Sequence, residues 1–421
     1  MHRHPGTPAL LLLLQPLTPS PPAGTPTHRG SAGGGFSLLE GDHIKINPFL
    51  LPLSWLYGWG VEVRNILFDT GTLRSERFDL PVISVGNLTV GGTGKTPHTE
   101  YLVRLLGQKY QVAVLSRGYK RRSHGFLMAT ADTPMHLIGD EPWQMRQKFA
   151  DIHVAVDNDR CHGIRQLLRP IVAPRTEVIL LDDAFQHRRV RPGLSLVLMD
   201  YHRLSCFDRL LPAGRLREPL SSLHRADVVI VTKCPKDITP MERHGISRSL
   251  GLQAWQKLFF THFVYDDLQP LGAGQPLPVT QLRHEERSIV LLTGIAAPQQ
   301  MEYDLQQLCR FTPLHFPDHH YFTRSDLRRI AQTLRSADPT PRHAIIITTE
   351  KDAARLHSLR QGSPDERHLI EDIQDDIYVL PAHVEFLGQG DTDKFNKLIT
   401  DYVAKNPRDR RFSQSAHGLA T

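Results

Sequence analysis

The chain has 421 residues, which exceeds one ordinary domain and suits two of about 150–200 residues each. Fifty Lys and Arg against 44 Asp and Glu give a formal charge of +6, which permits phosphate, nucleic-acid or membrane partners without choosing among them. A hydrophobic fraction of 40% excludes a mainly disordered chain, a mean hydropathy of −0.31 excludes a multi-spanning membrane protein, and four dispersed cysteines indicate a reducing compartment.

Two N-terminal segments differ from the rest of the chain. Residues 1–41 are rich in Pro, Gly, Ser and Thr, and we expect a disordered extension or a misassigned start there. In residues 42–79, the stretch 46–61 carries no charge but is shorter than the ~20 residues that cross a bilayer. Its residues, which include Trp55 and Trp59, suit either an amphipathic segment at a membrane surface or a helix packed on the protein body.

Residues 80–85 (LPVISV) predict a buried strand, and a glycine loop and a helical pattern over residues 98–106 follow it. This order is typical of a phosphate-binding loop (P-loop). Its nucleotide-binding residues would be Gly91, Gly92, Thr93, Gly94, Lys95 and Thr96. Lys95 would reach the β- and γ-phosphates, and Thr96 would ligate Mg²⁺. Thr89 stands where the common motif has its first glycine, and Val90 stands where partitioning ATPases carry a second lysine.

A second apolar run, residues 177–181, ends in Asp182 and Asp183. Carboxylates at the end of a strand suit a Mg²⁺ ion that bridges phosphates, and either aspartate is a candidate ligand. Further strands are predicted at residues 112–115, 152–156, 194–199 and 228–231. The alternation predicts an α/β fold, a P-loop-type α/β/α domain built on a mostly parallel sheet.

Several longer motifs occur in a fixed order. They are VGNLTVGGTGKTP (85–97), LSRGYKRRS (115–123), IGDEPWQM (138–145), AVDNDRCHGI (155–164), LLDDAFQHR (180–188), LLPAGRLREP (210–219), FPDHHYF (316–322) and TTEKDAARL (348–356). Together they closely resemble the tetraacyldisaccharide 4′-kinase family, the lipid A kinases of Gram-negative bacteria. The resemblance covers roughly residues 42–400, and the N-terminal extension departs from it.

The resemblance implies that the γ-phosphoryl group of ATP is transferred, with Mg²⁺, to the 4′-hydroxyl of an acylated glucosamine disaccharide 1-phosphate, which gives lipid IVA. It also implies peripheral attachment to an anionic membrane surface, the cytoplasmic face of the inner membrane, and so favours a membrane role for residues 42–79. We expect a P-loop kinase core domain at 80–265, a second, smaller α/β domain at 270–400 that completes the cleft, and a basic flexible tail at 401–421. Oligomeric state stays open.

Two residues match the catalytic pair of this family. Asp140 corresponds to its catalytic carboxylate, and His319 corresponds to the histidine that orients this carboxylate or shares the proton. With Lys95 they make up the expected catalytic set. Considered alone, Asp140 also suits a helix N-cap.

Other polar residues of these motifs are candidates for the same cleft. Glu141 and Glu218 are candidate metal carboxylates, while Arg117, Gln186, Arg215 and Arg217 are candidate phosphate contacts. The rival function is a peripheral membrane P-loop ATPase or GTPase switch acting on a protein partner. Nucleic acid is not expected as a partner, since the sequence carries no recognisable DNA or RNA module.

Overall fold

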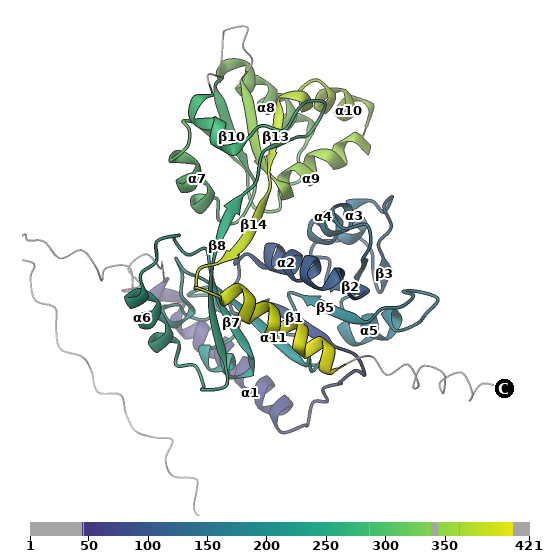
Figure 1. Cartoon of the computed structure of the whole chain (residues 1–421), viewed down its shortest axis with the longest axis vertical. Helices are drawn as coiled ribbons and strands as arrows, with labels where there is room; N and C mark the ends of the chain where they lie inside the picture. Colours follow the sequence, from purple (N-terminus) through teal and green to yellow (C-terminus); the bar gives the residue numbers. More distant parts are fainter. Residues whose placement is uncertain (1–43, 45, 286, 338–343, 362, 407–421) are drawn as a thin grey trace, which may run out of the picture. The chain divides into compact units, whose positions relative to one another are not determined.

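The computed structural model describes residues 44, 46–285, 287–337, 344–361 and 363–406. In it, strands that alternate with helices along the chain form two sheets (Figure 1). Within these residues, nine strands form the larger sheet in the order β14-β8-β7-β6-β1-β5-β2-β4-β3. They are β1 (Val82–Asn87), β2 (Val112–Ser116), β3 (Leu127–Met128), β4 (His153–Val156), β5 (Val178–Asp182), β6 (Leu194–Asp200), β7 (Val228–Thr232), β8 (Lys257–Tyr265) and β14 (Ala382–Phe386). Neighbouring strands are parallel except at the two edges, β3–β4 and β8–β14.

Helices cover both faces of this sheet, because successive strand residues point to opposite sides. Ile83 and Val85 of β1 belong to the apolar cluster shared with α2 and α11, whereas Val82 packs in the cluster shared with α5. The helices of this half are α1 (Leu51–Asp69), α2 (Lys95–Gly107), α3 (Met135–Ile138), α4 (Asp140–Lys148), α5 (Arg160–Leu167), α6 (Pro240–Leu250) and α11 (Asp391–Lys405). The predicted α/β/α layering around a mostly parallel sheet is confirmed.

The second sheet repeats this layering on a smaller scale, in the order β11-β10-β12-β13-β9. Its strands are β9 (Gln269–Pro270), β10 (Ile289–Thr293), β11 (Thr312–His315), β12 (Ile345–Thr349) and β13 (Ile377–Leu380). Its helices are α7 (Gln299–Gln306), α8 (Arg324–Ala337), α9 (Glu350–Ser358) and α10 (Pro364–Glu371). Helices α8, α9 and α10 share one apolar cluster with the sheet, and α7 shares the other.

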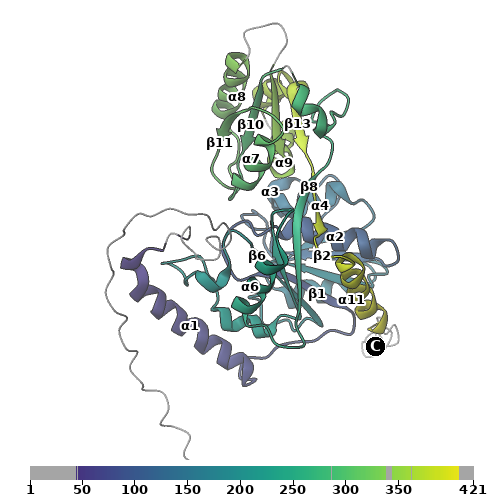
Figure 2. The same cartoon turned by 60° about the vertical axis from the view of Figure 1, so that its left-hand side comes forward.

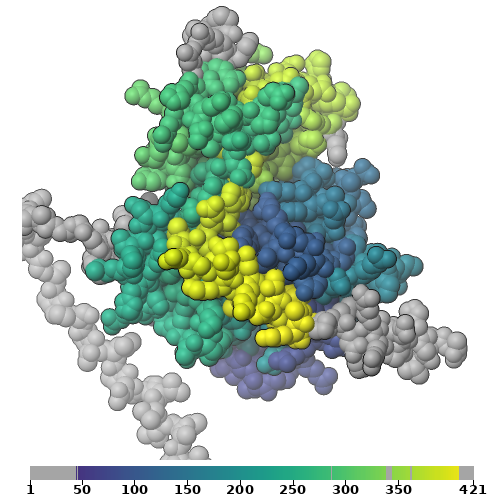
Figure 3. All heavy atoms as spheres, viewed as in Figure 1, coloured from purple at the N-terminus to yellow at the C-terminus, as the bar shows by residue number. Residues whose placement is uncertain are grey.

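The predicted boundaries of the second domain are wrong at the C-terminal end. The second sheet ends at Leu380, and the chain then returns to the larger sheet, where β14 pairs with β8. Phe395, Ile399 and Val403 of α11 are buried in the apolar cluster of the larger sheet, and Figure 3 shows α11 in yellow beside α2 in blue. The predicted start of a flexible tail at residue 401 is wrong, since α11 runs to Lys405. The rest of that prediction, residues 407–421, lies outside the described residues.

Helix α1 occupies most of the segment 42–79, and both interpretations of that segment find support. One face packs on the larger sheet's half, where Ser54 donates to the carbonyl oxygen of Leu210 at 2.9 Å. Figure 2 shows α1 in purple along the margin of this half. The other face of α1 leaves Trp55 72% and Trp59 70% exposed. Among the described residues, no helix combines the length and apolarity needed to cross a membrane. The extension predicted at 1–41 falls outside the described residues.

Candidate functional site

The P-loop runs from the end of β1 to the start of α2. Gly94 has φ 80°, and a Cβ at this position would lie 3.0 Å from the ring of Phe263, so glycine is required twice over. Asn87 Nδ2 donates to Thr93 Oγ1 at 2.9 Å, and Thr232 Oγ1 donates to the carbonyl oxygen of Thr93 at 3.0 Å. The loop is thus fixed to β1 and β7, and the free N–H groups of α2 start at Lys95, where a phosphate is favoured.

The buried His98 side chain links the P-loop to β8 through two hydrogen bonds. Its Nδ1 lies 2.8 Å from the carbonyl oxygen of Gly94, so Nδ1 donates, and Nε2 accepts from Thr261 Oγ1 at 3.0 Å. Burial lowers the pKa of His98 to about 4, against the opposing effect of the bond to Gly94. The imidazole is therefore neutral in the folded protein throughout the physiological range.

This depressed pKa predicts a loss of stability in mild acid. The unfolded chain protonates His98 near pH 6.5 and the folded chain only near pH 4, so stability present above about 6.5 falls by up to ~1.4 kcal/mol per pH unit between these values. Denaturant unfolding at about pH 7.5 and about pH 5 measures the loss. A His98→Gln variant should lose less free energy between these pH values than wild type; an equal loss in both proteins would contradict the assignment.

Three carboxylates gather beside the P-loop. Burial, followed by the charges of Glu141 and Asp183, raises the pKa of Asp182 to about 7. Asp183, with φ 48°, pairs with Lys95 at 3.4 Å and with Arg217 at 3.1 Å. Asp182 Oδ1 is buried without a hydrogen-bond partner. A hard divalent cation would satisfy this orphaned oxygen, so the donor set fits Mg²⁺.

Asp140 and His319 meet across 179 positions of sequence. Helix α4 has Gly139 as its N-cap, so Asp140 is the first helical residue, and its Oδ1 accepts from the N–H of Glu141 at 3.1 Å. Asp140 Oδ2 lies 2.9 Å from His319 Nδ1 and 2.6 Å from an Arg355 guanidinium nitrogen. Burial would raise the pKa of Asp140, but the hydrogen bond with His319 and the charges of Lys351, Arg355 and His319 prevail and hold that pKa well below its usual range.

Two positively charged residues of α9 complete this constellation. Arg355 is almost fully buried and also binds Asp352 at 2.8 Å, while Lys351 contacts Glu141 at 2.5 Å. Both residues belong to the motif TTEKDAARL (348–356), which carried the family resemblance without suggesting a role. Sequence reasoning missed them because a helical Arg or Lys ordinarily indicates a solvated surface.

The other predicted residues divide into two groups. Arg215 and Arg217 lie at the P-loop, where the carbonyl oxygen of Arg215 accepts from Val90 N–H at 2.8 Å; Arg117 is exposed. Gln186 instead donates from its side-chain Nε2 to the carbonyl oxygen of Asn87 at 2.7 Å, and its backbone carbonyl oxygen accepts from Arg64 at 2.6 Å. Glu218 is buried in ion pairs with Arg64 and Arg225. Gln186 and Glu218 are thus committed to structural contacts in this arrangement.

The P-loop and the histidine face one cavity of about 550 Å³. Its lining includes Lys95, Thr96, Asp183, Glu141 and His319. Phe263, Ala296 and Met301 supply apolar walls. The cavity can therefore hold a polyphosphate at the start of α2 and bring its end toward the carboxylates and the imidazole.

Comparison with known proteins identifies the family. The family described as "Tetraacyldisaccharide-1-P 4'-kinase" matches residues 46–404. The chain belongs to the tetraacyldisaccharide 4′-kinase family. A curated tetraacyldisaccharide 4′-kinase of Phocaeicola vulgatus is 52% identical over 379 residues, which cover 89% of this chain and 100% of that protein. The family resemblance predicted from the sequence is confirmed.

Further members of the kinase family agree with this assignment. The tetraacyldisaccharide 4′-kinase of Bacteroides thetaiotaomicron is 49% identical over 388 residues, or 89% of this chain and 98% of that protein. The crystal structure of LpxK from Aquifex aeolicus in complex with ATP is similar with a TM-score of 0.62 and 30% identity, over 84% of this chain and 98% of that chain. The P-loop kinase fold expected from the motifs is therefore shared with a solved family structure.

Proposed function

We propose that the chain transfers the γ-phosphoryl group of ATP to the 4′-hydroxyl of tetraacyldisaccharide 1-phosphate. The observation that carries the proposal is the contact of Asp140 with His319 at the cavity that also holds Lys95. Transfer to an alcohol needs a group that removes the hydroxyl proton as well as a phosphate clamp. A switch that acts on a protein partner has no use for a dyad completed by a second domain.

Each residue then has a step in the reaction. Lys95 and the N–H groups at the start of α2 bind the β- and γ-phosphates. Asp140 accepts from His319 Nδ1 and fixes the orientation of the imidazole, and the pair takes up the proton of the 4′-hydroxyl. Arg355 keeps Asp140 ionised and in place. Arg215 and Arg217 are proposed to bind substrate phosphate oxygens.

Mg²⁺ is the cation that we propose for the carboxylate site. Thr96 and Asp182 would hold it, with Glu141 and Asp183 close by, because these are the oxygen donors beside the P-loop. When bound, Mg²⁺ would neutralise charge on the phosphates. Glu218 has no place in this set, since its carboxylate pairs with two arginines.

The proposed reaction is tested by measuring ADP release with and without an acceptor. Tetraacyldisaccharide 1-phosphate in detergent should accelerate ADP release strongly, whereas the same lipid without its 4′-hydroxyl should not. ATP hydrolysis at one unchanged rate in all three mixtures would refute the lipid kinase and favour the switch.

We further propose that α1 holds the enzyme at an anionic membrane surface, the cytoplasmic face of the inner membrane. Trp55, Leu56 and Trp59 are exposed on one face, and such side chains favour the boundary between water and lipid. Replacing Trp55 and Trp59 by Ser should weaken sedimentation with anionic vesicles about tenfold or more, since each buried aromatic contributes ~1.5–3 kcal/mol. Trp255→Ser, at an exposed tryptophan outside α1, is the control; an equal loss there, or none in the α1 variant, would contradict the proposal.

A further inference from the structure

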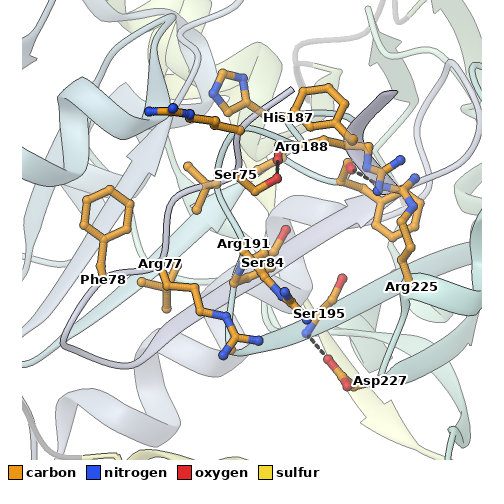
Figure 4. A pocket seen from close by; sticks show the side chains of 18 of the residues that line it. Ser75, Arg77, Phe78, Ser84, His187, Arg188, Arg191, Ser195, Arg225 and Asp227 are labelled. Atoms are coloured by element: carbon orange, nitrogen blue, oxygen red, sulfur yellow. Dashed lines mark hydrogen bonds between the residues drawn. The ribbon is translucent and has the colours of Figure 1, made fainter. Parts of the chain in front are cut away.

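A second cavity, of about 1410 Å³, lies over the first halves of β1 and β6 (Figure 4). Ser84 and Ser195 line it from these strands, whereas the P-loop follows the last residue of β1. The end of α1 with the segment after it and the loop between β5 and β6 supply most of the other walls, and Arg225, Asp227, Tyr402 and Asn406 complete them. None of its lining residues lines the P-loop cavity, so it is a separate site.

Five arginines line this cavity, and they differ in their partners. Arg188 pairs with Asp69 and Arg225 pairs with Glu218, so the positive charges of these two arginines are compensated. The side chains of Arg74, Arg77 and Arg191 have neither a hydrogen bond nor an ion pair within the described residues.

The acidic groups of the lining cannot neutralise these three guanidinium groups. Asp69 forms an ion pair with Arg188, and Asp227 accepts a hydrogen bond from the backbone N–H of Ser195 at 2.7 Å. Asp227 keeps its charge, since its partner is a neutral N–H group, so Asp79 and Asp227 are two carboxylates against three guanidinium groups. The cavity therefore carries an uncompensated positive charge.

The rest of the lining suits a ligand larger than a free anion. The side-chain hydroxyls of Ser84 and Ser195 are without partners among the described residues and can donate to an oxygen. Phe68, Leu73 and Phe78 provide an apolar wall beside the arginines. Guanidinium forks and hydroxyls favour the several oxygens of a phosphate, and the apolar wall favours the group that carries it.

We propose that this cavity binds a phosphomonoester carried on a larger organic group, at a site distinct from the ATP site. The phosphate would lie against Arg77 and Arg191, which line the cavity together with Ser84 and Ser195 (Figure 4). A water-soluble phosphomonoester and a phosphomonoester lipid share this chemistry. The site is independent of the proposed kinase reaction, since it uses none of its residues.

The test measures binding by calorimetry with the full chain in saturating ADP and Mg²⁺, which occupies the P-loop. Glycerol 3-phosphate is the soluble probe. The lipid probe is phosphatidylcholine vesicles with phosphatidic acid, compared with vesicles of equal surface charge that carry the phosphodiester phosphatidylglycerol, to which α1 should bind equally. Wild type should bind glycerol 3-phosphate, or bind phosphatidic acid vesicles more tightly than the charge-matched vesicles. R77Q/R191Q should lose this binding by about tenfold or more, since it lacks two charged hydrogen bonds to the phosphate. ADP release with ATP and the lipid acceptor should stay unchanged in this variant, which shows that it folds.

The control is R328Q/R367Q, which removes two exposed arginines of the smaller sheet's helices. It should bind like wild type. Binding of glycerol 3-phosphate alone identifies a soluble ligand, and tighter binding of phosphatidic acid vesicles than of the charge-matched vesicles identifies a lipid. Failure of wild type to bind either probe, equal binding by R77Q/R191Q, or an equal loss in the control would overturn the proposal.

Discussion

Replacing Asp140 by Ala should lower turnover by a factor of ~10² or more while leaving ATP affinity nearly unchanged. Asp140 lies 2.9 Å from His319 and holds the imidazole from the opposite half of the chain. Without the carboxylate, the imidazole loses its orientation, and the 4′-hydroxyl loses the group that receives its proton. Initial rates of ADP release at saturating acceptor lipid measure the effect.

The neighbouring histidine offers a matched control. His320 lies 2.9 Å from Asp326, so Asp326→Ala breaks a carboxylate–imidazole contact of the same length that lies outside the lining of the ATP cavity. We expect its turnover to remain within about twofold of wild type, with some loss of stability because Asp326 also accepts from Thr323, typically ~1 kcal/mol for such a cap. Equal losses of turnover in the two variants would reduce Asp140 to a structural residue.

Lys95→Met should lower turnover by about 10²–10³, because an aimed positive charge is removed from the transferring phosphoryl group. Lys95 begins α2 and lies 3.4 Å from Asp183, so its ammonium group already faces the carboxylates of the site. In contrast to Asp140→Ala, this variant should also bind ATP more weakly, since Lys95 contacts the phosphates before the reaction.

Lys109→Met is the control for charge alone. Lys109 is exposed just after α2, and its loss should change neither ATP affinity nor turnover. Nucleotide binding by calorimetry separates the two effects of Lys95. Unchanged turnover in Lys95→Met would show that the P-loop lysine takes no part in phosphoryl transfer.

Local patterns predicted the parts of the fold that depend on neighbouring residues. The apolar runs that became β1 and β5 are buried along their whole length, and the glycine loop between β1 and α2 needs the left-handed backbone of Gly94. By contrast, the pairing of β14 with β8 joins residues more than 100 positions apart. No local pattern encodes such a contact, so the predicted domain boundary at residue 400 was wrong.

The same distinction applies to the candidate site. Motifs predicted the roles of Lys95, Asp182 and Asp183, because the chemistry of these residues depends on the end of a strand and the start of a helix. The partners of Glu218 do not follow, since Arg64 comes from α1 and Arg225 lies seven positions beyond Glu218. The role of Arg355 could not be predicted either, because it depends on an ion pair with Asp140 from the other half of the chain.

The most direct test follows the label from γ-labelled ATP into the lipid. The purified full chain is incubated with Mg²⁺ and tetraacyldisaccharide 1-phosphate in detergent, and the product is analysed for the position of the new phosphate. The proposed kinase reaction should give a labelled bisphosphorylated glycolipid with the label on the 4′-oxygen, at a rate that Asp140→Ala reduces about a hundredfold. Label found only in inorganic phosphate, under conditions in which ATP is consumed, would contradict it.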